Sequence, residues 1–392
     1  MVFFLLQLID FKLYNSASKL PDSWNKLPTE DLFLKTDFLK GLEASYPKNI
    51  SAFYFGVFKS NKLVGIAIVQ RVEMYLDDVF RKKPTYCIKQ FAKDTISSIV
   101  KGNALVVGNL MHTGQHGIYF NAEQITQDKY LETLDHGINE LTILIKKEFN
   151  KKIRIIAFKD YFDNDNIHKS AQFFSKNKLY KVQVQPNMIF PIRHNWSSIN
   201  DYCLDLSKKY RRRYKTAIKK GYSIDRRELS LNEIRELNNE LFRLYKNVSD
   251  NAGVNSFILS ENHFLSLKQH LKDDFRIFGY FKEDILVGFY SLILNHKSLE
   301  TYFLGYDQES QRELQMYLNM LYDMTRFAIE NKFETVVYAR TAMEIKSSIG
   351  AKPNTMHIYL KHTNSLMANT VLKLIVKYMN PIREWEERHP FK

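Results

Sequence analysis

The chain has 392 residues, of which 45% are hydrophobic and 14% aromatic, a composition that indicates a globular protein and excludes an intrinsically disordered one. This length exceeds that of one ordinary hydrophobic core and favours about two domains. The formal net charge of +14 favours acidic partners such as phosphorylated cofactors, an acidic carrier protein, RNA or an anionic membrane face.

The opening stretch and the cysteines indicate the cellular compartment in which the protein is expected to work. The stretch MVFFLLQLID lacks a basic leader and is followed by Lys12, so we interpret it as a buried first strand rather than a signal peptide. The two cysteines, Cys87 and Cys203, are too few and too far apart for a disulfide framework or a zinc cluster, and both are expected to be buried. No run of about 20 apolar residues is present, so no membrane span is predicted. A cytoplasmic protein is therefore expected.

The first half of the sequence centres on a predicted β-hairpin. The stretch FGVFKSNKLVG, from Phe55, places two apolar strands around a polar tip at residues 59–62, and Gly65 is expected to relieve crowding or allow a bulge. Helical sequence precedes the hairpin at residues 31–44. After it, the pattern predicts a strand at 104–107, a long helix at 129–149, a strand from 153, a short helix near Ser170 and a final strand at 182–192.

The second half repeats this order. The stretch FGYFKEDILVG, from Phe278, matches the first hairpin at seven of eleven positions without a gap. Helical sequence precedes it at residues 231–248 and 261–272. After it, the pattern predicts a strand at 298–304, a long helix at 311–331, a strand at 334–339, a short helix at 341–348 and a strand at 355–362. The chain is therefore predicted to hold two copies of one fold, at residues 1–195 and 196–362, followed by an amphipathic helix and tail at 363–392.

Most of the positive charge lies between the two hairpins. Residues 208–227 hold ten Lys or Arg and one Asp, a net +9 of the chain's +14. The spacing of the apolar residues from Leu206 predicts a helix that ends at Gly221. A solvated helix face is one interpretation; because closely spaced cations repel one another, binding of a phosphate-bearing donor or lipid head group is favoured. The candidate binding residues here are Arg211, Arg212, Arg213, Lys215 and Lys219.

The order of elements resembles the GNAT acyltransferase fold. The fold class is accordingly α/β (α+β), with two tandem GNAT folds that have mixed central sheets. The segments LSKKYRRRYKTAIKKGYSI and IKSSIG are similar to those of Fem-type peptidyltransferases, and the likeness is best from about Leu204 to Lys361. In the first half, the segment SAQFFSKNKL places Phe174, which has no proton to give, where many GNAT chains have a tyrosine. The resemblance implies that the second half is the catalytic one.

Several residues of the second half are candidates for the site. The resemblance implies a catalytic or charge-stabilising role for Lys346. Thr341 and Glu344 have the spacing of a capping box, Arg340 ends a strand at a crevice edge, and Arg340 and Glu344 are counted among the candidate donor-binding residues. Among the tyrosines near the third strand, Tyr306 is the candidate proton donor because it follows Gly305 at the strand's exit, and Tyr290 and Tyr302 are further candidate substrate contacts, with core packing as the alternative for all three.

Neither half has a clean pyrophosphate-binding loop. The stretches VVGNLMHTGQHGIYF and LGYDQESQREL are out of register with that motif, so use of CoA is open. No tightly bound cofactor is expected; acyl-CoA or an acyl-carrier protein would act as co-substrate. His112 and His116 lack a Cys or acidic partner in sequence, so no metal site is predicted.

Three functions remain open at this point. The first is an N-acyltransferase that moves an acyl group from acyl-CoA or an acyl-carrier protein to an amine in lipid or cell-envelope biosynthesis. The second is a Fem-like peptidyltransferase that takes its donor from aminoacyl-tRNA and acts on a peptidoglycan precursor. The third is a non-catalytic pseudo-transferase that binds an acidic carrier or a membrane. A monomer that does not bind DNA is expected, with peripheral contact to the inner face of the membrane through the helix at 364–379 as an option.

Overall fold

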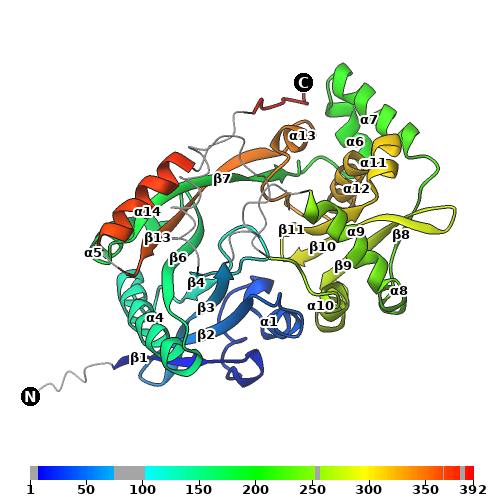
Figure 1. The fold of residues 1–392 in the computed structure, drawn as a ribbon. Coiled ribbons are helices and arrows are strands. Elements are labelled where there is room, and N and C mark those ends of the chain that lie inside the picture. The colour runs from blue at the N-terminus through cyan, green and yellow to red at the C-terminus, as the bar shows by residue number, and fades with distance from the viewer. Residues whose placement is uncertain (1–7, 75–101, 252–256, 365, 380–384) are drawn as a thin grey trace, which may run out of the picture. The chain divides into compact units, whose positions relative to one another are not determined.

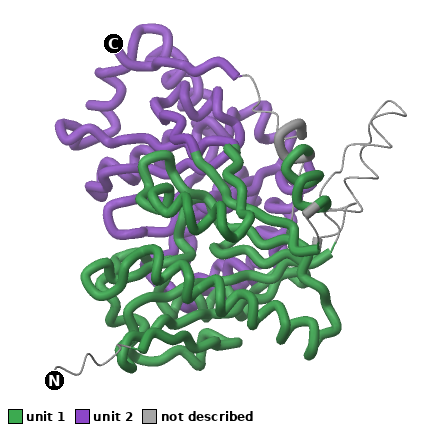
Figure 2. Tube along the Cα trace, turned by 90° about the vertical axis from the view of Figure 1, so that its left-hand side faces the viewer, with its two compact units in different colours: residues 1–184, 253–257, 356–381 green, residues 185–252, 258–355, 382–392 purple. Residues whose placement is uncertain are grey.

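The structure is a computed structural model that describes residues 8–74, 102–251, 257–364, 366–379 and 385–392. It forms two compact units, coloured separately in Figure 2. Unit 1 comprises residues 1–184, 253–257 and 356–381, and unit 2 comprises residues 185–252, 258–355 and 382–392. Each unit is described separately below.

Unit 1 is a mixed sheet with one long helix packed on it. Its strands are β1 (Ile9–Tyr14), β2 (Ile50–Lys59), β3 (Lys62–Met74), β4 (Gly102–Val107), β5 (Ile118–Phe120) and β6 (Ile153–Phe162), joined by most of β13 (Lys352–His362). The sheet order is β1-β2-β3-β4-β6-β13, with β5 paired to β3, and only the β4–β6 pair is parallel among the registers described for it. Its helices are η1 (Ala17–Lys19), η2 (Leu32–Leu34), α1 (Thr36–Glu43), α4 (Gln127–Phe149), η3 (Asn166–Ser170), α5 (Ala171–Lys176) and α14 (Leu366–Met379).

Unit 2 is built the same way around its own hairpin (Figure 1). Its strands are β8 (Asp225–Glu228), β9 (Phe275–Lys282), β10 (Ile285–Asn295), β11 (Ser298–Tyr306) and β12 (Thr335–Val337), joined by the end of β7 (Tyr180–Pro191). The sheet order is β7-β12-β11-β10-β9-β8, and the β11–β12 pair is parallel. Its helices are α6 (Ile199–Asp205), α7 (Lys208–Lys220), α8 (Leu231–Glu236), α9 (Asn238–Asp250), α10 (His263–Leu271), η4 (Lys272–Asp274), α11 (Gln308–Leu314), α12 (Met316–Glu330) and α13 (Met343–Ser347).

The two hairpins share their turn and their irregularity. Each has a two-residue turn with positive φ at both positions, namely Ser60 and Asn61 in the first hairpin and Glu283 and Asp284 in the second. In each, the pairing register shifts just before the glycine of the Leu-Val-Gly sequence: Gly65 pairs with Val57, and Gly288 pairs with Tyr280. The repeat in the sequence is therefore a repeat in backbone geometry.

Each glycine of the Leu-Val-Gly sequence lets the long helix of its unit approach the sheet. A Cβ at Gly65 would lie 2.7 Å from the ring of Tyr130 in α4, and a Cβ at Gly288 would lie 2.9 Å from Cε of Met316 in α12. These helices carry the two main cores: α4 buries Leu131, Leu134, Ile138 and Leu141 with the strands of unit 1, and α12 buries Met320, Leu321, Met324 and Ala328 with those of unit 2. Burial of this apolar surface is the main stabilising contribution in both units.

The last strand of each half belongs to the sheet of the other unit. From Met356 onward, β13 lies in unit 1 and pairs antiparallel with β6, whereas Ile189–Pro191 of β7 lies in unit 2 and pairs with β12. The order of elements in the sequence predicts instead that residues 356–362 belong to the second domain and 185–195 to the first. Strand periodicity shows that a strand exists but not which neighbour it pairs with, and this is why the units divide at different residues.

Two local predictions in the second half were wrong. The long helix predicted at 311–331 is broken at Gln315, which has φ 50°, so that α11 and α12 are separate. Thr341 is not a helix N-cap: it has φ 68°, and α13 begins at Met343 after Ala342, without a side-chain cap. Both sites have left-handed backbone at residues other than glycine, which pattern analysis does not foresee.

Other expectations have mixed outcomes. The hydrophobic start of MVFFLLQLID and Cys87 lie outside the described residues, and Cys203 is a half-buried free thiol. Among the helices that the structure describes, none has the length and hydropathy needed to cross a membrane. Within the same residues, no group of three or more His, Cys, Asp or Glu side chains is arranged to hold a metal ion.

Candidate functional site

The basic helix α7 is anchored in unit 2 by a few of its residues. Tyr210 and Ala217 are buried in the core, and Asn319 of α12 donates from Nδ2 to the Ala217 carbonyl oxygen at 2.9 Å. The helix ends at Gly221, as predicted, and the backbone N–H of Gly221 donates to Ala217. Most other positions of α7 carry Lys or Arg.

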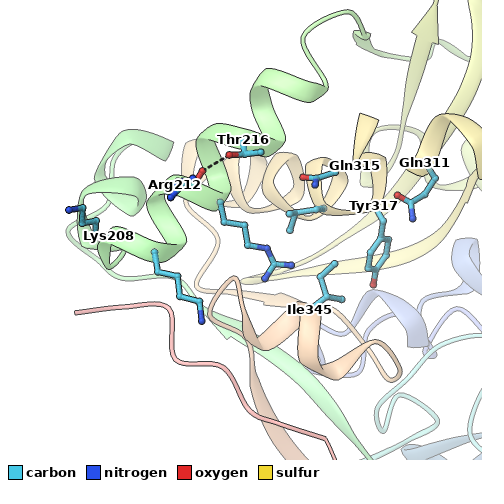
Figure 3. A pocket seen from close by; sticks show the side chains of 10 residues that line it. Lys208, Arg212, Thr216, Gln311, Gln315, Tyr317 and Ile345 are labelled. Carbon is cyan, nitrogen blue, oxygen red and sulfur yellow. Dashed lines mark hydrogen bonds between the residues drawn. The ribbon is translucent and has the colours of Figure 1, made fainter. Parts of the chain in front are cut away.

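A cavity of about 810 Å³ lies beside α7 (Figure 3). Its walls come from α7, from the broken α11–α12 segment and from α13. The lining residues are Lys208, Lys209, Arg212, Arg213, Thr216, Gln311, Gln315, Tyr317, Leu318 and Ile345. We call it the basic cavity, because four of these side chains are cationic and none is acidic. A volume of this size is typical of small-molecule and cofactor sites.

The four cations of the basic cavity are not paired with carboxylates of the described residues. Lys208, Lys209, Arg212 and Arg213 form no ion pair with any carboxylate among the described residues. Their positive potential therefore remains available to an anion, and arginine in particular can bind phosphate oxygens in a bidentate manner. The cavity is electrostatically suited to a phosphate-bearing ligand.

A second cavity of about 570 Å³ shares Lys209, Arg213 and Ile345 with the basic cavity. Its remaining lining residues are Tyr210, Ala342, Met343, Glu344, Trp385 and Arg388. Glu344 forms an ion pair with Arg388 there, so its carboxylate is neutralised by the C-terminal segment. Donor binding by Glu344, a sequence-based prediction, stays a prediction.

The side chain of Lys346 is buried and holds a loop. Its Nζ donates to the carbonyl oxygens of Tyr338 at 2.5 Å, Arg340 at 2.6 Å and Ala339 at 3.3 Å. The residues of this loop include left-handed backbone at Ala339, Thr341 and Ala342, and Nζ of Lys346 supplies the N–H donors for its converging carbonyl oxygens. Burial lowers the pKa of Lys346 to about 7.

This geometry supports a structural role for Lys346. Nζ of Lys346 lies within hydrogen-bond distance of three carbonyl oxygens, and Lys346 lines neither cavity, although its neighbour Ile345 lines both. Its catalytic role stays a prediction. Arg340 is half-buried and also lines neither cavity; its carbonyl oxygen is one of the three that Lys346 binds.

The three candidate tyrosines lie in different surroundings. Tyr290 is buried in the core and stacks on Phe278 with ring centroids 5.0 Å apart. The hydroxyl of Tyr302 lies 3.1 Å from Nε2 of His263 in α10. Tyr306 is half-buried, and its ring centroid lies 6.4 Å from that of Tyr317, which lines the basic cavity. Of the three, Tyr306 is the one that packs beside this cavity.

The basic residues proposed from the sequence also differ in their locations and contacts. Arg212 and Arg213 line the basic cavity, whereas Lys215 and Lys219 line neither cavity. Arg211 donates to three carbonyl oxygens at the end of α6, those of Cys203, Leu204 and Leu206, and thereby caps that helix. Their shared position on one helix therefore does not imply a shared role.

Sequence reasoning missed several residues of the basic cavity, most importantly Tyr317. Burial raises its pKa, and the neighbouring Tyr306 adds to the shift, so its hydroxyl stays protonated at neutral pH. Gln311, Gln315 and Tyr317 lie together because the chain breaks between α11 and α12 (Figure 3). Nothing in the hydrophobic pattern signals that break.

Comparisons with known proteins identify the fold. No protein-family profile matches the chain in sequence, and no curated protein matches it. The crystal structure of FemX is similar over 94% of this chain and 100% of its own, with a TM-score of 0.53 and 11% identity. A tandem GNAT protein from the clavulanic acid biosynthesis pathway (TM-score 0.49, 9% identity, 91% of this chain and 99% of that one) and L-PGS from Bacillus licheniformis (0.45, 10%, 88% and 96%) are also similar. The predicted Fem-like tandem GNAT fold is confirmed.

Proposed function

We propose that the chain is an N-acyltransferase whose basic cavity in unit 2 holds the phosphates of an activated acyl donor. The observation that carries this proposal is the basic cavity itself: four cations without counter-ions among the described residues, next to a tyrosine hydroxyl. The fold supports it, because unit 2 has the parallel strand pair, β11 and β12, of a GNAT-type arrangement. That pairing stops at Glu300 and Val337, while β11 continues to Tyr306.

The reaction requires one bond to form and one to break. The acceptor amine attacks the carbonyl carbon of the donor, the new N–C bond forms, and the bond from that carbon to the donor's sulfur or oxygen breaks. The amine loses a proton and the leaving group gains one. Tyr317 is placed to give that proton because it lines the basic cavity and a tyrosine hydroxyl is protonated at neutral pH; Tyr306 packs beside it.

Lys346 contributes to this mechanism by positioning. Its three hydrogen bonds fix the loop at 338–342, which continues into α13 and therefore places Ile345 in the wall of both cavities. Correct placement of the reacting groups supplies a large part of the rate of such transfers. A donor proton from Lys346 is not needed in this scheme.

For the donor we favour acyl-CoA or an acyl-carrier protein, both of which carry phosphate groups, and for the acceptor an amine in lipid or cell-envelope biosynthesis. The protein would work in the cytoplasm as a monomer, with peripheral contact to the anionic inner face of the membrane. The net charge of +14 supports this location near anionic surfaces.

A second candidate is a transferase that takes its acyl group from aminoacyl-tRNA. One observation favours it: the cations of α7 extend beyond the basic cavity to Lys215, Lys219 and Lys220, a longer basic surface than one pyrophosphate needs. A pseudo-transferase that only binds an acidic carrier or a membrane is the third candidate.

Calorimetric titration of the full chain with CoA, and separately with a deacylated tRNA mixture, tests the proposal. We expect CoA to bind, and the double variant Arg212→Ala/Arg213→Ala to weaken binding by at least roughly tenfold, since each charge-assisted phosphate contact contributes on the order of 1.5–3 kcal/mol. The matched control is Arg235→Ala/Arg243→Ala, which removes the same charge from unit 2 outside both cavities. It should bind CoA as the wild type does.

Turnover is then followed as release of free CoA from acetyl-CoA and longer acyl-CoAs in the presence of cell-envelope extracts. Binding of tRNA with no binding of CoA would replace the first candidate by the second. Binding of CoA without any detectable transfer would favour the non-catalytic binding module. If neither CoA nor tRNA binds, the basic cavity is not a donor site and the proposal is wrong.

A further inference from the structure

Unit 1 has a cavity of its own with the opposite chemistry. Its volume is about 470 Å³, and no Lys or Arg is among its lining residues. We call it the acidic cavity, because Asp31 and Asp165 line it together with four aromatic side chains, Tyr119, Phe120, Tyr161 and Phe162. It lies in the same part of the fold as the basic cavity of unit 2, near the start of the long helix, since Gln127 at the first position of α4 also lines it.

Most polar groups around the acidic cavity are used by the fold. The amide oxygen of Gln115 accepts from the backbone N–H of Gly117, and the amide nitrogen of Gln127 donates to the Asn166 carbonyl oxygen. Asp31 accepts from the backbone of Phe33 and lies 2.8 Å from Nδ1 of His116. These groups shape the wall of the cavity.

The hydroxyl of Tyr161 is an exception. Tyr161 is 2% exposed, and its hydroxyl has no hydrogen-bond partner among the described residues. A buried hydroxyl without a partner costs roughly 1–3 kcal/mol, so such groups are uncommon in native proteins. A ligand that enters the acidic cavity and displaces the atoms that shield this hydroxyl would supply the missing partner.

Asp165 lines the same cavity and acts electrostatically on this hydroxyl. One of its carboxylate oxygens, Oδ2, accepts from the backbone N–H of Phe162 at 2.7 Å, and Oδ1 makes no hydrogen bond within the part of the chain that the structure describes. Burial raises the pKa of the Asp165 carboxyl, and the negative charge of Asp165 in turn helps to raise the pKa of Tyr161. A positive charge beside Asp165 would offset that desolvation.

We infer that the acidic cavity of unit 1 is a binding site for a small molecule with a protonated amine. An ammonium group can pair with Asp165, pack against the aromatic rings through cation–π interactions, and leave a polar atom of the ligand within reach of the Tyr161 hydroxyl. Phosphate-bearing molecules are disfavoured there, because the lining contains carboxylates and no cation. This site is independent of the donor site proposed for unit 2.

Tyramine and tyrosol are a matched pair of probes, since they differ only by an amine in one and a hydroxyl in the other. In titrations of the full chain followed by ligand-observed NMR, we expect tyramine to bind with a dissociation constant in the millimolar range or tighter, and tyrosol to bind at least roughly tenfold more weakly. Binding of tyramine should weaken as the pH falls through the raised pKa of Asp165, because protonation removes the negative charge.

Two variants and one control locate the site. Asp165→Asn can keep the contact with the Phe162 N–H and should remove the preference for tyramine over tyrosol. Tyr161→Phe should weaken tyramine binding without lowering the melting temperature, since the free protein loses only a buried hydroxyl that lacks a described partner. Asp163→Asn, two residues from Asp165 and outside the cavity, should bind both probes as the wild type does.

Each result supports or overturns the inference. Equal binding of tyramine and tyrosol, no binding of tyramine up to ~20 mM, or tyramine binding that Asp165→Asn leaves unchanged would overturn it. The variant Arg212→Ala/Arg213→Ala should leave tyramine binding intact, so failure of the donor proposal and failure of this one give different results.

Discussion

The basic cavity of unit 2 and the acidic cavity of unit 1 are built on the same hairpin scaffold but present opposite charge. The hairpins share their turns, the register shift and the Leu-Val-Gly glycine. The cavity linings do not correspond: four cations come from α7, which precedes the hairpin of unit 2, whereas unit 1 has η1, η2 and α1 in that part of its sequence. The repeated residues therefore maintain the scaffold, and segments outside the repeat set the charge of each cavity.

The largest expected effect comes from the buried amine of Lys346, which unit 2 has and unit 1 lacks at the corresponding position. Unit 1 has the apolar Phe174, stacked on Tyr359 at 3.7 Å, where unit 2 has Lys346. We expect Lys346→Met to lower the free energy of unfolding by roughly 3 kcal/mol, because three carbonyl oxygens lose their donor. Chemical denaturation measures this, with Lys352→Met, an exposed lysine of the same unit, as the control.

The same variant distinguishes positioning from catalysis. If Lys346 only positions the loop, CoA binding and stability should fall together, and Lys346→Arg should restore part of both. Unchanged stability and CoA affinity with a lower turnover number would instead show that the amine takes part in the reaction.

A second test follows the pH dependence of unit 2 stability. The pKa of Lys346 is about 7 in the folded state and near its ordinary value of 10.5 when unfolded, so between these values the unfolded chain binds more protons. Stability contributed through this group therefore rises with pH across that window, by at most ~1.4 kcal/mol per pH unit. The free energy of unfolding of the wild type minus that of Lys346→Met, measured from pH 7 to 10, should increase; a flat difference would contradict the shift.

A third test compares equivalent glycines. Gly65→Ala would push a methyl group against the Tyr130 ring, which is held by a hydrogen bond from its hydroxyl to the Ile66 carbonyl oxygen, whereas Gly288→Ala would meet mainly the flexible ends of Met316 and Met320. We expect a loss of roughly 2–3 kcal/mol for the first variant and about half of that for the second. Thermal unfolding measures both. Equal losses would show that the two helix–sheet contacts are alike in rigidity.

The smallest expected effect concerns salt. CoA binding in the basic cavity should weaken about threefold or more between ~50 and ~200 mM salt, because several cations act together, whereas tyramine binding in the acidic cavity should change less, because one carboxylate dominates. Parallel titrations at both salt concentrations measure this. A steeper salt dependence for tyramine would contradict the assignment of the two charges to their cavities.

The scaffold could be predicted from the sequence, since it depends on local patterns. Alternating apolar strands around 59–62 and 282–284 predicted both hairpins, and the helical period predicted α4 and most of α7. The repeated order of elements predicted the tandem fold that the likeness to FemX confirms. Each single hairpin or helix among these features depends only on residues within about 20 positions of one another.

The candidate site was only partly predictable. The charge of α7 identified Arg212 and Arg213, but the left-handed break at Gln315, which brings Tyr317 to the basic cavity, depends on tertiary packing. The burial of Lys346 among three carbonyl oxygens could not be predicted either, because a lysine in a polar segment is ordinarily expected to be exposed. The acidic cavity combines residues from several separate segments of unit 1, and no short pattern joins them.

The placement of β13 has a consequence for synthesis on the ribosome. Unit 1 needs Met356–His362 beside β6 to complete its sheet, and these residues are translated after nearly all of unit 2. The edge of β6 that pairs with β13 therefore stays unpaired while roughly 200 further residues are synthesised, at about 5–20 residues per second. The nascent chain thus carries an uncovered strand edge for on the order of 10 seconds or longer, during which this edge can pair with the strand of another chain.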